Sequence, residues 1–238
     1  MLIQTIRRPF LWRACAALAW FVGASLASGC MGERAERTTL AVYAASSLHE
    51  SFEALAVEFE RMHPGVEVGL SFSGSQVLRL QIENGARADV FASANPEHID
   101  ALIDSGMMDS SRVFAANQLA LIVPASNPAG IETLLDLTKA NRLVIGAPSV
   151  PVGRYARALL DKADVAYGAN FSERVKRRVV SEEKNVRLVR AKVELGEADA
   201  ALVYQTDVRG TDSLLRVGLP SALNVKADYA MGRTRHAR

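Results

Sequence analysis

Apolar and polar positions along residues 40–220 fall into short blocks that alternate between strand-like and helix-like spacing. Apolar runs and alternating blocks predict strands at 40–45, 66–72, 88–93, 114–124, 142–149, 175–181, 198–208 and 213–220. An apolar stripe at helical spacing predicts helices at 48–59, 77–85, 96–106, 131–140, 152–163 and 185–196. Strands that alternate with helices in this way predict βαβ units, so the expected fold class is α/β with mostly parallel sheets. The strand at 114–124 is long enough to pass from one lobe to another.

The first 30 residues depart from this pattern. A basic start (MLIQTIRRPFLWR) precedes an apolar stretch (ACAALAWFVGASLA) that is too short for a permanent membrane span. The stretch ends at LASGC, where small residues before Cys30 resemble a bacterial lipobox. We therefore expect residues 1–30 to be an export signal, with Cys30 lipidated as the new N-terminus. Ordinary cleavage nearby is the alternative, and the polar residues 31–38 are expected to form a tether.

Charge and cysteine content exclude several function classes. The chain has 28 Lys and Arg against 26 Asp and Glu, and the first 30 residues contain three arginines and no acid. The remainder is nearly neutral and gives no reason to expect nucleic acid as a partner. Cys15 lies inside the apolar stretch, so no internal disulfide or cysteine metal site is expected. The four histidines show no metal-ligand spacing.

Small polar residues gather where predicted strands give way to helices, at the edge where open α/β sheets bind ligands. The four corners are Ser46–Ser47, Ser73–Ser75, 146–156 and 184–189. Taken singly, each has a structural explanation: Ser47 and Glu50, for example, fit a capping box at a helix start. Taken together, the four helix starts are expected to surround an anion.

A helix N-terminus offers unpaired backbone N–H groups and the positive end of a dipole. Several such ends, with serine hydroxyls beside them, hold an anion without a charged side chain. Such a site avoids the desolvation cost of a buried lysine or arginine. It would select its anion by radius and protonation state.

The sequence offers less support for an enzyme. It contains no G-x-S-x-G motif and no phosphate-binding P-loop. Asp89 and Asp199, near strand starts, are interpreted as capping or hinge groups. A serine hydrolase remains an alternative that requires a base beside Ser47 or Ser75, and His49 is expected on another face of its helix.

Five stretches resemble the periplasmic molybdate-binding proteins of ABC transporters and occur in that family's order. They are VYAASSLHESFEALAVEFERMHPGVEV, SFSGSQVLRLQIENGARADVFASA, RLVIGAPSVPVGRYA, NVRLVRAKVELGEADAALVY and ADY at 227–229. The resemblance implies a type II periplasmic-binding-protein fold with two α/β lobes and a ligand cleft between them. It implies molybdate or tungstate as the ligand, with no cofactor and no catalytic residue.

Carried over to this sequence, the family's ligand contacts fall at five positions. The resemblance assigns hydroxyl donors to two serines and a tyrosine and backbone donors to two valines: Ser47, Ser75, Val152, Val186 and Tyr204. Val152 stands where many relatives have alanine, and a backbone contact tolerates that change. Ser46 and Gln76 are expected beside the site rather than on the anion.

The resemblance also divides the chain. Lobe 1 is expected at 39–118, lobe 2 at 119–225 and a truncated return segment at 226–238. Relatives continue with a second crossing strand and closing helices, which we expect to be missing here, leaving apolar surface of lobe 1 uncovered and stability reduced.

The function implied is that of an extracytoplasmic, lipid-anchored and monomeric solute-binding protein that delivers its oxyanion to an ABC permease. Two alternatives remain open at this point. One is a binding protein for another tetrahedral oxyanion such as sulfate, and the other is a truncated remnant without function.

Overall fold

The computed structural model describes residues 37–235. The expected export signal, the lipidated Cys30 and most of the tether lie outside this range. Within residues 37–235, no helix is both long and apolar enough to cross a bilayer.

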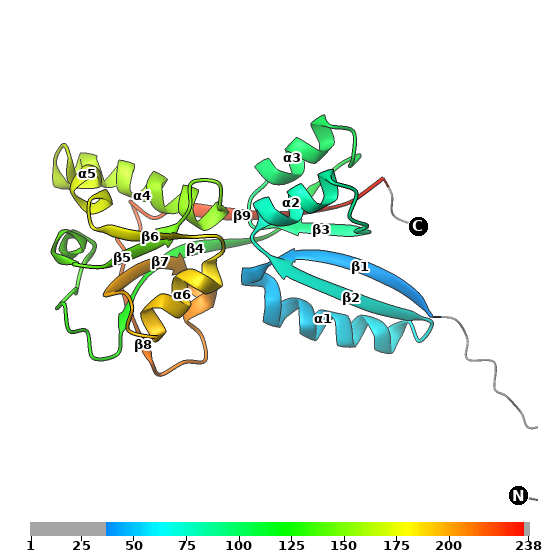
Figure 1. Ribbon diagram of the computed structural model, residues 1–238, viewed down its shortest axis with the longest axis horizontal. Helices are drawn as coiled ribbons and strands as arrows, with labels where there is room; N and C mark the ends of the chain where they lie inside the picture. The colour runs from blue at the N-terminus through cyan, green and yellow to red at the C-terminus, as the bar shows by residue number, and fades with distance from the viewer. Residues whose placement is uncertain (1–36, 236–238) are drawn as a thin grey trace, which may run out of the picture. The chain divides into compact units, whose positions relative to one another are not determined.

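The first lobe is built on three parallel strands. β1 (Thr38–Ala45) pairs with β2 (Val66–Ser73) on one side and with β3 (Val90–Ser93) on the other. The helices are α1 (His49–Met62), α2 (Ser75–Glu83) and α3 (Glu97–Asp104). Figure 1 shows α1 on the opposite side of these strands from α2 and α3.

The second lobe repeats this plan. β5 (Leu143–Gly146) runs parallel to both β6 (Val179–Glu183) and β7 (Ala200–Tyr204). Its helices are α4 (Pro151–Tyr167), α5 (Phe171–Lys176) and α6 (Val186–Glu194). All five residues of β7 are buried, as expected of a strand covered on both faces. The α/β fold class predicted from the sequence is confirmed.

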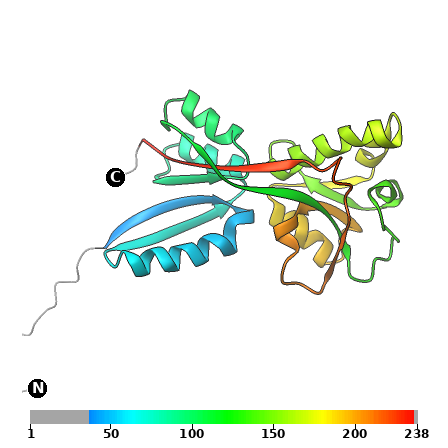
Figure 2. The same cartoon turned by 180° about the vertical axis from the view of Figure 1, so that it is seen from behind.

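Two long antiparallel strands join the lobes. In β4 (Arg112–Pro124), residues 112–118 pair with β9 (Lys226–Arg233), and residues 119–122 pair with β7. The end of β4 also pairs with β8 (Leu214–Val217). β9 continues into the first lobe, where it pairs with β3. Figure 2 shows β4 and β9 side by side between the lobes.

The expectation that the second crossing strand is missing is therefore wrong. β9 is that strand, and its sequence KADYAMGR places Ala227, Tyr229 and Ala230 in buried positions. The basic residues Lys226 and Arg233 lie at the two exposed ends of this strand. Pairing on both sides, with β3 and with β4, satisfies the backbone of this segment.

An apolar groove of about 300 Å³ lies between α1 and the first-lobe sheet. Phe52, Leu55 and Phe59 line one wall, and Val42 and Val68 line the other. Leu55 is 60% exposed, an unusual value for a residue on the apolar stripe of a helix.

Three elements differ from the sequence predictions. The helix expected at 131–140 is a short 3-10 helix, η2 (Leu134–Lys139). The strand expected at 175–181 is divided between the end of α5 and the start of β6. The strand expected at 198–208 ends at Tyr204 and continues as the 3-10 helix η3 (Gln205–Val208).

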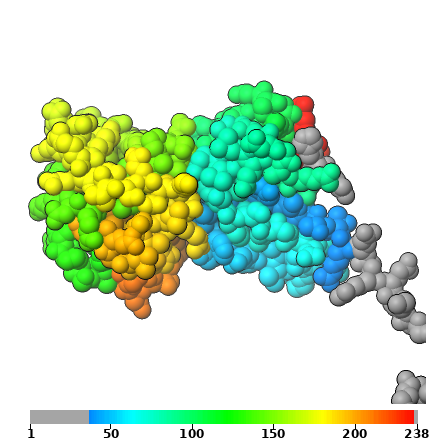
Figure 3. Space-filling model, viewed as in Figure 1, coloured from blue at the N-terminus to red at the C-terminus, as the bar shows by residue number. Residues whose placement is uncertain are grey.

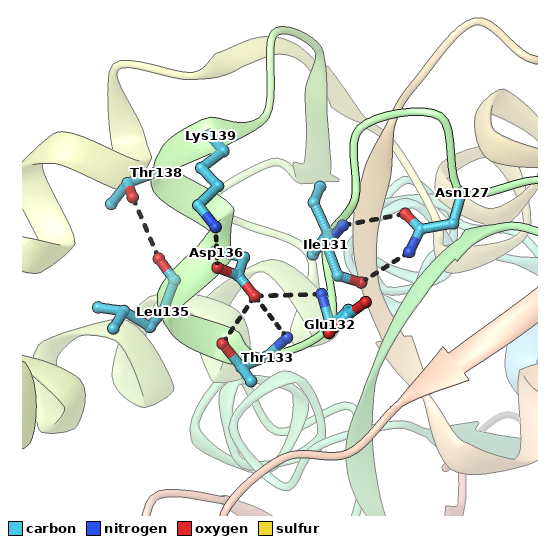
Figure 4. A network of polar contacts seen from close by, with 8 residues as sticks. All are labelled: Asn127, Ile131, Glu132, Thr133, Leu135, Asp136, Thr138 and Lys139. Carbon is cyan, nitrogen blue, oxygen red and sulfur yellow. Dashed lines mark hydrogen bonds and ion pairs between the residues drawn. The ribbon is translucent and has the colours of Figure 1, made fainter.

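The start of η2 is fixed by a polar network around Asp136 (Figure 4). Oδ2 of Asp136 accepts hydrogen bonds from the backbone N–H of Glu132 (3.1 Å) and from the N–H and hydroxyl of Thr133 (2.9 Å each). Lys139 pairs with the other oxygen at 2.7 Å. These interactions, with the Lys139 ion pair first, lower the pKa of Asp136 to about 2.

Candidate functional site

The five positions singled out in the sequence line one cavity. Ser47, Ser75, Val152, Val186 and Tyr204 all contribute to its wall. The remaining lining residues are small, apolar or amide side chains: Ala45, Ser46, Ser73, Gly74, Ala94, Val150, Pro151 and Asn185. The cavity measures about 10 Å³, far below the size of a pocket for a drug-sized ligand. A cavity of this size excludes a drug-sized ligand.

Each of the five residues stands at the carboxyl end of a parallel strand. Ser47 belongs to the 3-10 helix η1 (Ser46–Leu48), which follows β1 directly, and Ser75 is the first residue of α2 after β2. Val152 lies in the first turn of α4, and Val186 is the first residue of α6. Tyr204 is the last residue of β7. Both lobes thus contribute strand ends to one space, as expected at the ligand-binding edge of α/β sheets.

Ser47 does not cap a helix. Neither η1 nor α1 has a side-chain hydrogen bond at its N-cap, so the predicted capping box with Glu50 is wrong. Glu50 instead pairs with Arg187 of the second lobe, and this hydrogen bond holds its pKa below the usual value. The Ser47 hydroxyl accepts a hydrogen bond from the Tyr229 hydroxyl at 2.9 Å. Its own hydrogen is available to the cavity.

The Ser75 hydroxyl is also held by a hydrogen bond, in this case from a backbone group of the first lobe. The side chain of Ser75 is 1% exposed, and its Oγ accepts the backbone N–H of Ala94 at 3.1 Å. A hydroxyl that accepts through one lone pair still has a hydrogen to donate. Both serines therefore present donors to the cavity.

Tyr204 supplies the third hydroxyl. Its side chain is 1% exposed, and its oxygen has no hydrogen-bond partner among residues 37–235. A buried hydroxyl without a partner is costly, so a ligand that accepts its hydrogen bond relieves that cost. Burial raises the pKa of Tyr204 well above its usual value, so it remains a neutral donor.

Asp207 fixes the backbone at Tyr204 through a hydrogen bond. Its Oδ2 accepts the backbone N–H of Tyr204 at 3.0 Å in the first turn of η3. Burial raises the pKa of Asp207 to about 7. This contact ties the end of β7 to η3.

The cavity wall carries no charged side chain. The positive ends of α2, α4 and α6 and their free backbone N–H groups supply the favourable potential instead. Among the described residues, no group of three or more histidine, cysteine, aspartate or glutamate side chains is arranged to hold a metal ion. The donor set suits an anion.

Polar contacts cross from one lobe to the other around the cavity. Nε2 of Gln76 donates to the carbonyl of Lys184 at 2.7 Å, and His98 Nε2 lies 3.1 Å from the carbonyl of Ser149. Nε of Arg187 donates to the carbonyl of Ser46 at 3.0 Å. Figure 3 shows the surface where the segments around α6 meet the first lobe. This arrangement is a closed one.

Among residues 37–235, neither Ser47 nor Ser75 has a hydrogen bond to a histidine or carboxylate side chain that could act as the base of a hydrolase. His49 pairs with Glu53 at 3.3 Å and packs against Phe72. The hydrogen-bond partners of Ser47 and Ser75 are a phenol and a backbone amide. Asp199, expected as a capping or hinge group, accepts two backbone N–H groups near the start of β5 and pairs with Arg142.

Sequence reasoning missed Tyr229 and Asp207. Tyr229 was noted only as part of the motif at 227–229, and its bond to Ser47 spans 182 positions of the chain. No local signal identifies such a partner. Asp207 had a weak signal, since an acid three residues after a strand end is a common capping arrangement.

The hydroxyls and helix N-termini around this cavity suit a small anion. The family model described as bacterial extracellular solute-binding protein matches residues 40–238, and the chain belongs to this family. The family is extracellular, so the protein acts outside the cytoplasm. The molybdate-binding protein ModA of Mycobacterium tuberculosis (strain ATCC 25618 / H37Rv) is 35% identical over 210 residues, covering 87% of this chain and 77% of that protein.

Two solved structures share the fold. The periplasmic molybdate-binding protein of Azotobacter vinelandii superposes with a TM-score of 0.67 at 20% identity, covering 84% of this chain and 86% of the other. The sulfate-binding protein SubI of Mycobacterium tuberculosis H37Rv gives a TM-score of 0.73 at 16% identity, covering 84% and 76%. Proteins named for two different oxyanions, molybdate and sulfate, therefore share this architecture. The fold alone does not identify which oxyanion a protein binds.

Proposed function

We propose that this protein captures molybdate or tungstate outside the cytoplasm and delivers it to the permease of an ABC transporter. The observation that carries this proposal is the single small cavity lined by Ser47, Ser75, Val152, Val186 and Tyr204 with no charged side chain. The 35% identity to a molybdate-binding protein supports molybdate over sulfate.

In the proposed complex, hydroxyls of Ser47, Ser75 and Tyr204 and the backbone N–H groups of Val152 and Val186 donate to the oxygens of the anion. These donors come from both lobes, so the anion favours the arrangement in which the lobes are together. Release to the permease then requires the lobes to separate about β4 and β9, the two strands that join them.

The anchoring and assembly expected from the sequence are part of this proposal. Lipidation at Cys30 would hold the protein at the outer face of the membrane beside its permease. A monomer suffices, because one chain supplies every donor named here.

The direct test is calorimetric titration with molybdate, tungstate and sulfate. We expect molybdate and tungstate to bind and sulfate to bind more weakly. Preferential binding of sulfate would replace the proposal with a sulfate-binding function, and no binding of any of the three would refute an oxyanion function.

Tyr204→Phe tests the site itself. The variant removes the one hydroxyl without a protein partner and keeps the ring, so molybdate affinity should fall about tenfold, the effect of losing one hydrogen bond to a charged acceptor. Tyr43→Phe, which removes a hydroxyl from β1 outside the cavity lining, is the matched control and should bind like the wild type. Equal affinities for wild type and Tyr204→Phe would exclude Tyr204 as a ligand contact.

A further inference from the structure

Tyr229 approaches the anion cavity from behind Ser47 without lining it. It lies on β9, is 2% exposed, and packs its ring 5.7 Å from that of Tyr204. Its hydroxyl donates to Ser47 Oγ at 2.9 Å. The return strand is thus connected to the candidate site through one hydrogen bond.

The direction of this hydrogen bond follows from acidity. A phenol is a stronger acid than an aliphatic hydroxyl, so the tyrosine donates and the serine accepts. Burial raises the pKa of Tyr229 above its usual range, and the phenol therefore keeps its hydrogen. The Ser47 hydrogen cannot also point at Tyr229, and the cavity that Ser47 lines is open to it.

A hydroxyl that accepts one hydrogen bond is also polarised to donate a stronger one. Ser75 is placed in the same way by the backbone N–H of Ala94. Both serines are therefore fixed as donors, one by a backbone group and one by a side chain. Only the hydrogen bond from the Tyr229 side chain can be removed by substitution.

We infer that Tyr229 is a positioning residue that keeps the Ser47 hydroxyl a donor and so makes the site prefer fully deprotonated oxyanions. Molybdate and sulfate accept from every oxygen. Hydrogen phosphate carries an O–H that needs an acceptor, and a cavity lined by oriented donors offers none. Without Tyr229, the Ser47 hydroxyl is free to rotate and to turn a lone pair toward that O–H.

The test compares wild type, Tyr229→Phe and the control Tyr43→Phe, titrated with molybdate, sulfate and inorganic phosphate near neutral pH. Sulfate and phosphate are similar in size, so the ratio of their affinities reports the effect of anion protonation rather than of anion radius. The inference rests on the proposed oxyanion function. We expect Tyr229→Phe to lose about tenfold in molybdate affinity and to lose less, or gain, with phosphate.

A double-mutant cycle with Ser47→Ala separates positioning from general loss of structure. If Tyr229 acts through Ser47, Tyr229→Phe changes molybdate affinity little when Ser47 is already alanine. Equal losses in both backgrounds, or an unchanged ratio of sulfate to phosphate affinity in Tyr229→Phe, would overturn the inference while leaving the proposed function intact. Failure of the wild type to bind molybdate or sulfate would instead refute the function.

Discussion

At the scale of single residues, Gly74 shows how closely the lobes approach. A Cβ at this position would lie 2.3 Å from the carbonyl oxygen of Lys184, which belongs to the other lobe. The backbone of Gly74 is extended, with φ −63° and ψ 139°, a conformation open to any residue. Glycine is therefore required here by the neighbouring lobe and not by its own backbone.

This leads to a prediction for Gly74→Ala. The first lobe should fold normally, because the alanine backbone is unstrained, but the lobes should not close fully. We expect the melting temperature without ligand to stay within a few degrees of wild type, and molybdate affinity to fall more than about tenfold, since the donors of the two lobes no longer converge.

Gly69→Ala is the matched control. A Cβ there meets its nearest atom, in the Thr39 side chain, at 3.5 Å, an ordinary contact within the first lobe. Its affinity should match wild type. Wild-type affinity in Gly74→Ala would show that closure does not depend on this contact.

The family resemblance assigned the five residues that line the cavity, and the local pattern of small polar residues marked the corners that hold Ser47 and Ser75. Neither showed how the hydroxyls of these residues are held. The role of Tyr229 depends on a partner 182 positions away, and that of Ser75 on the amide of Ala94 across the ends of β2 and β3. Contacts of this kind are set by the packed fold and leave no local pattern.

At the scale of elements, the network around Asp136 decides the form of the segment at 131–140. The capping box with Thr133 starts a helix, but only six residues separate it from the turn into β5. The apolar spacing predicted a helix over 131–140, and the structure has a shorter 3-10 helix within that range. We attribute the 3-10 form to the small number of residues between the capping box and the turn into β5.

Asp136→Asn should destabilise the protein by about 1 kcal/mol at neutral pH, or roughly 2–4 °C in melting temperature. The pKa of Asp136 is lowered to about 2 from 3.8. Its stabilisation is therefore complete above pH 3.8 and is lost as the pH falls through about 2. The Lys139 side chain of this pair is 64% exposed, and solvent screening therefore reduces the effect below the full value of the pKa shift.

Thermal melting at several pH values checks this. The difference between wild type and Asp136→Asn should be constant near neutrality and shrink in acid. Glu58→Gln, which removes an exposed pair with Arg61, is the control and should change stability less. A stability difference between wild type and Asp136→Asn that grows as the pH falls would contradict the stabilising role assigned to ionised Asp136.

At the scale of the whole molecule, closure of the lobes depends on contacts outside the cavity. His98 of α3 reaches the carbonyl of Ser149 in the other lobe. Burial lowers its pKa below 6.5, with the charges of Arg79 and Arg154 acting in the same direction, while the bond to Ser149 and the charge of Glu97 oppose them. Neutral His98 therefore suits the closed arrangement.

The sign of the pH effect follows. Separation of the lobes would expose His98 and return its pKa toward 6.5, so protonation favours the open arrangement. Molybdate affinity should fall as the pH is lowered from about 7.5 to about 5.5. His98→Gln keeps a donor for Ser149 but does not titrate, and it should flatten this dependence in calorimetric titrations. An equally steep dependence in the variant would assign the effect to another group.

The sequence predicted the α/β class, and β4 changes its partner from β9 to β7 between Gln118 and Leu119. It did not predict β9, because KADYAMGR followed by basic residues lacks a long apolar run. The strand forms because β3 and β4 each offer it a free edge. These free edges exist only after the rest of the sheet has assembled. The composition of the segment alone therefore does not predict that it forms a strand.

The packing of Tyr155, Tyr204 and Tyr229 has a spectroscopic consequence. Both tryptophans lie within the first 30 residues, so residues 37–235 contain no indole to dominate their ultraviolet signal. The ring of Tyr204 lies 6.4 Å from that of Tyr155 and 5.7 Å from that of Tyr229, beside the anion cavity. Phenol chromophores so close together couple optically. Near-ultraviolet circular dichroism should therefore provide an intrinsic, label-free readout of occupancy.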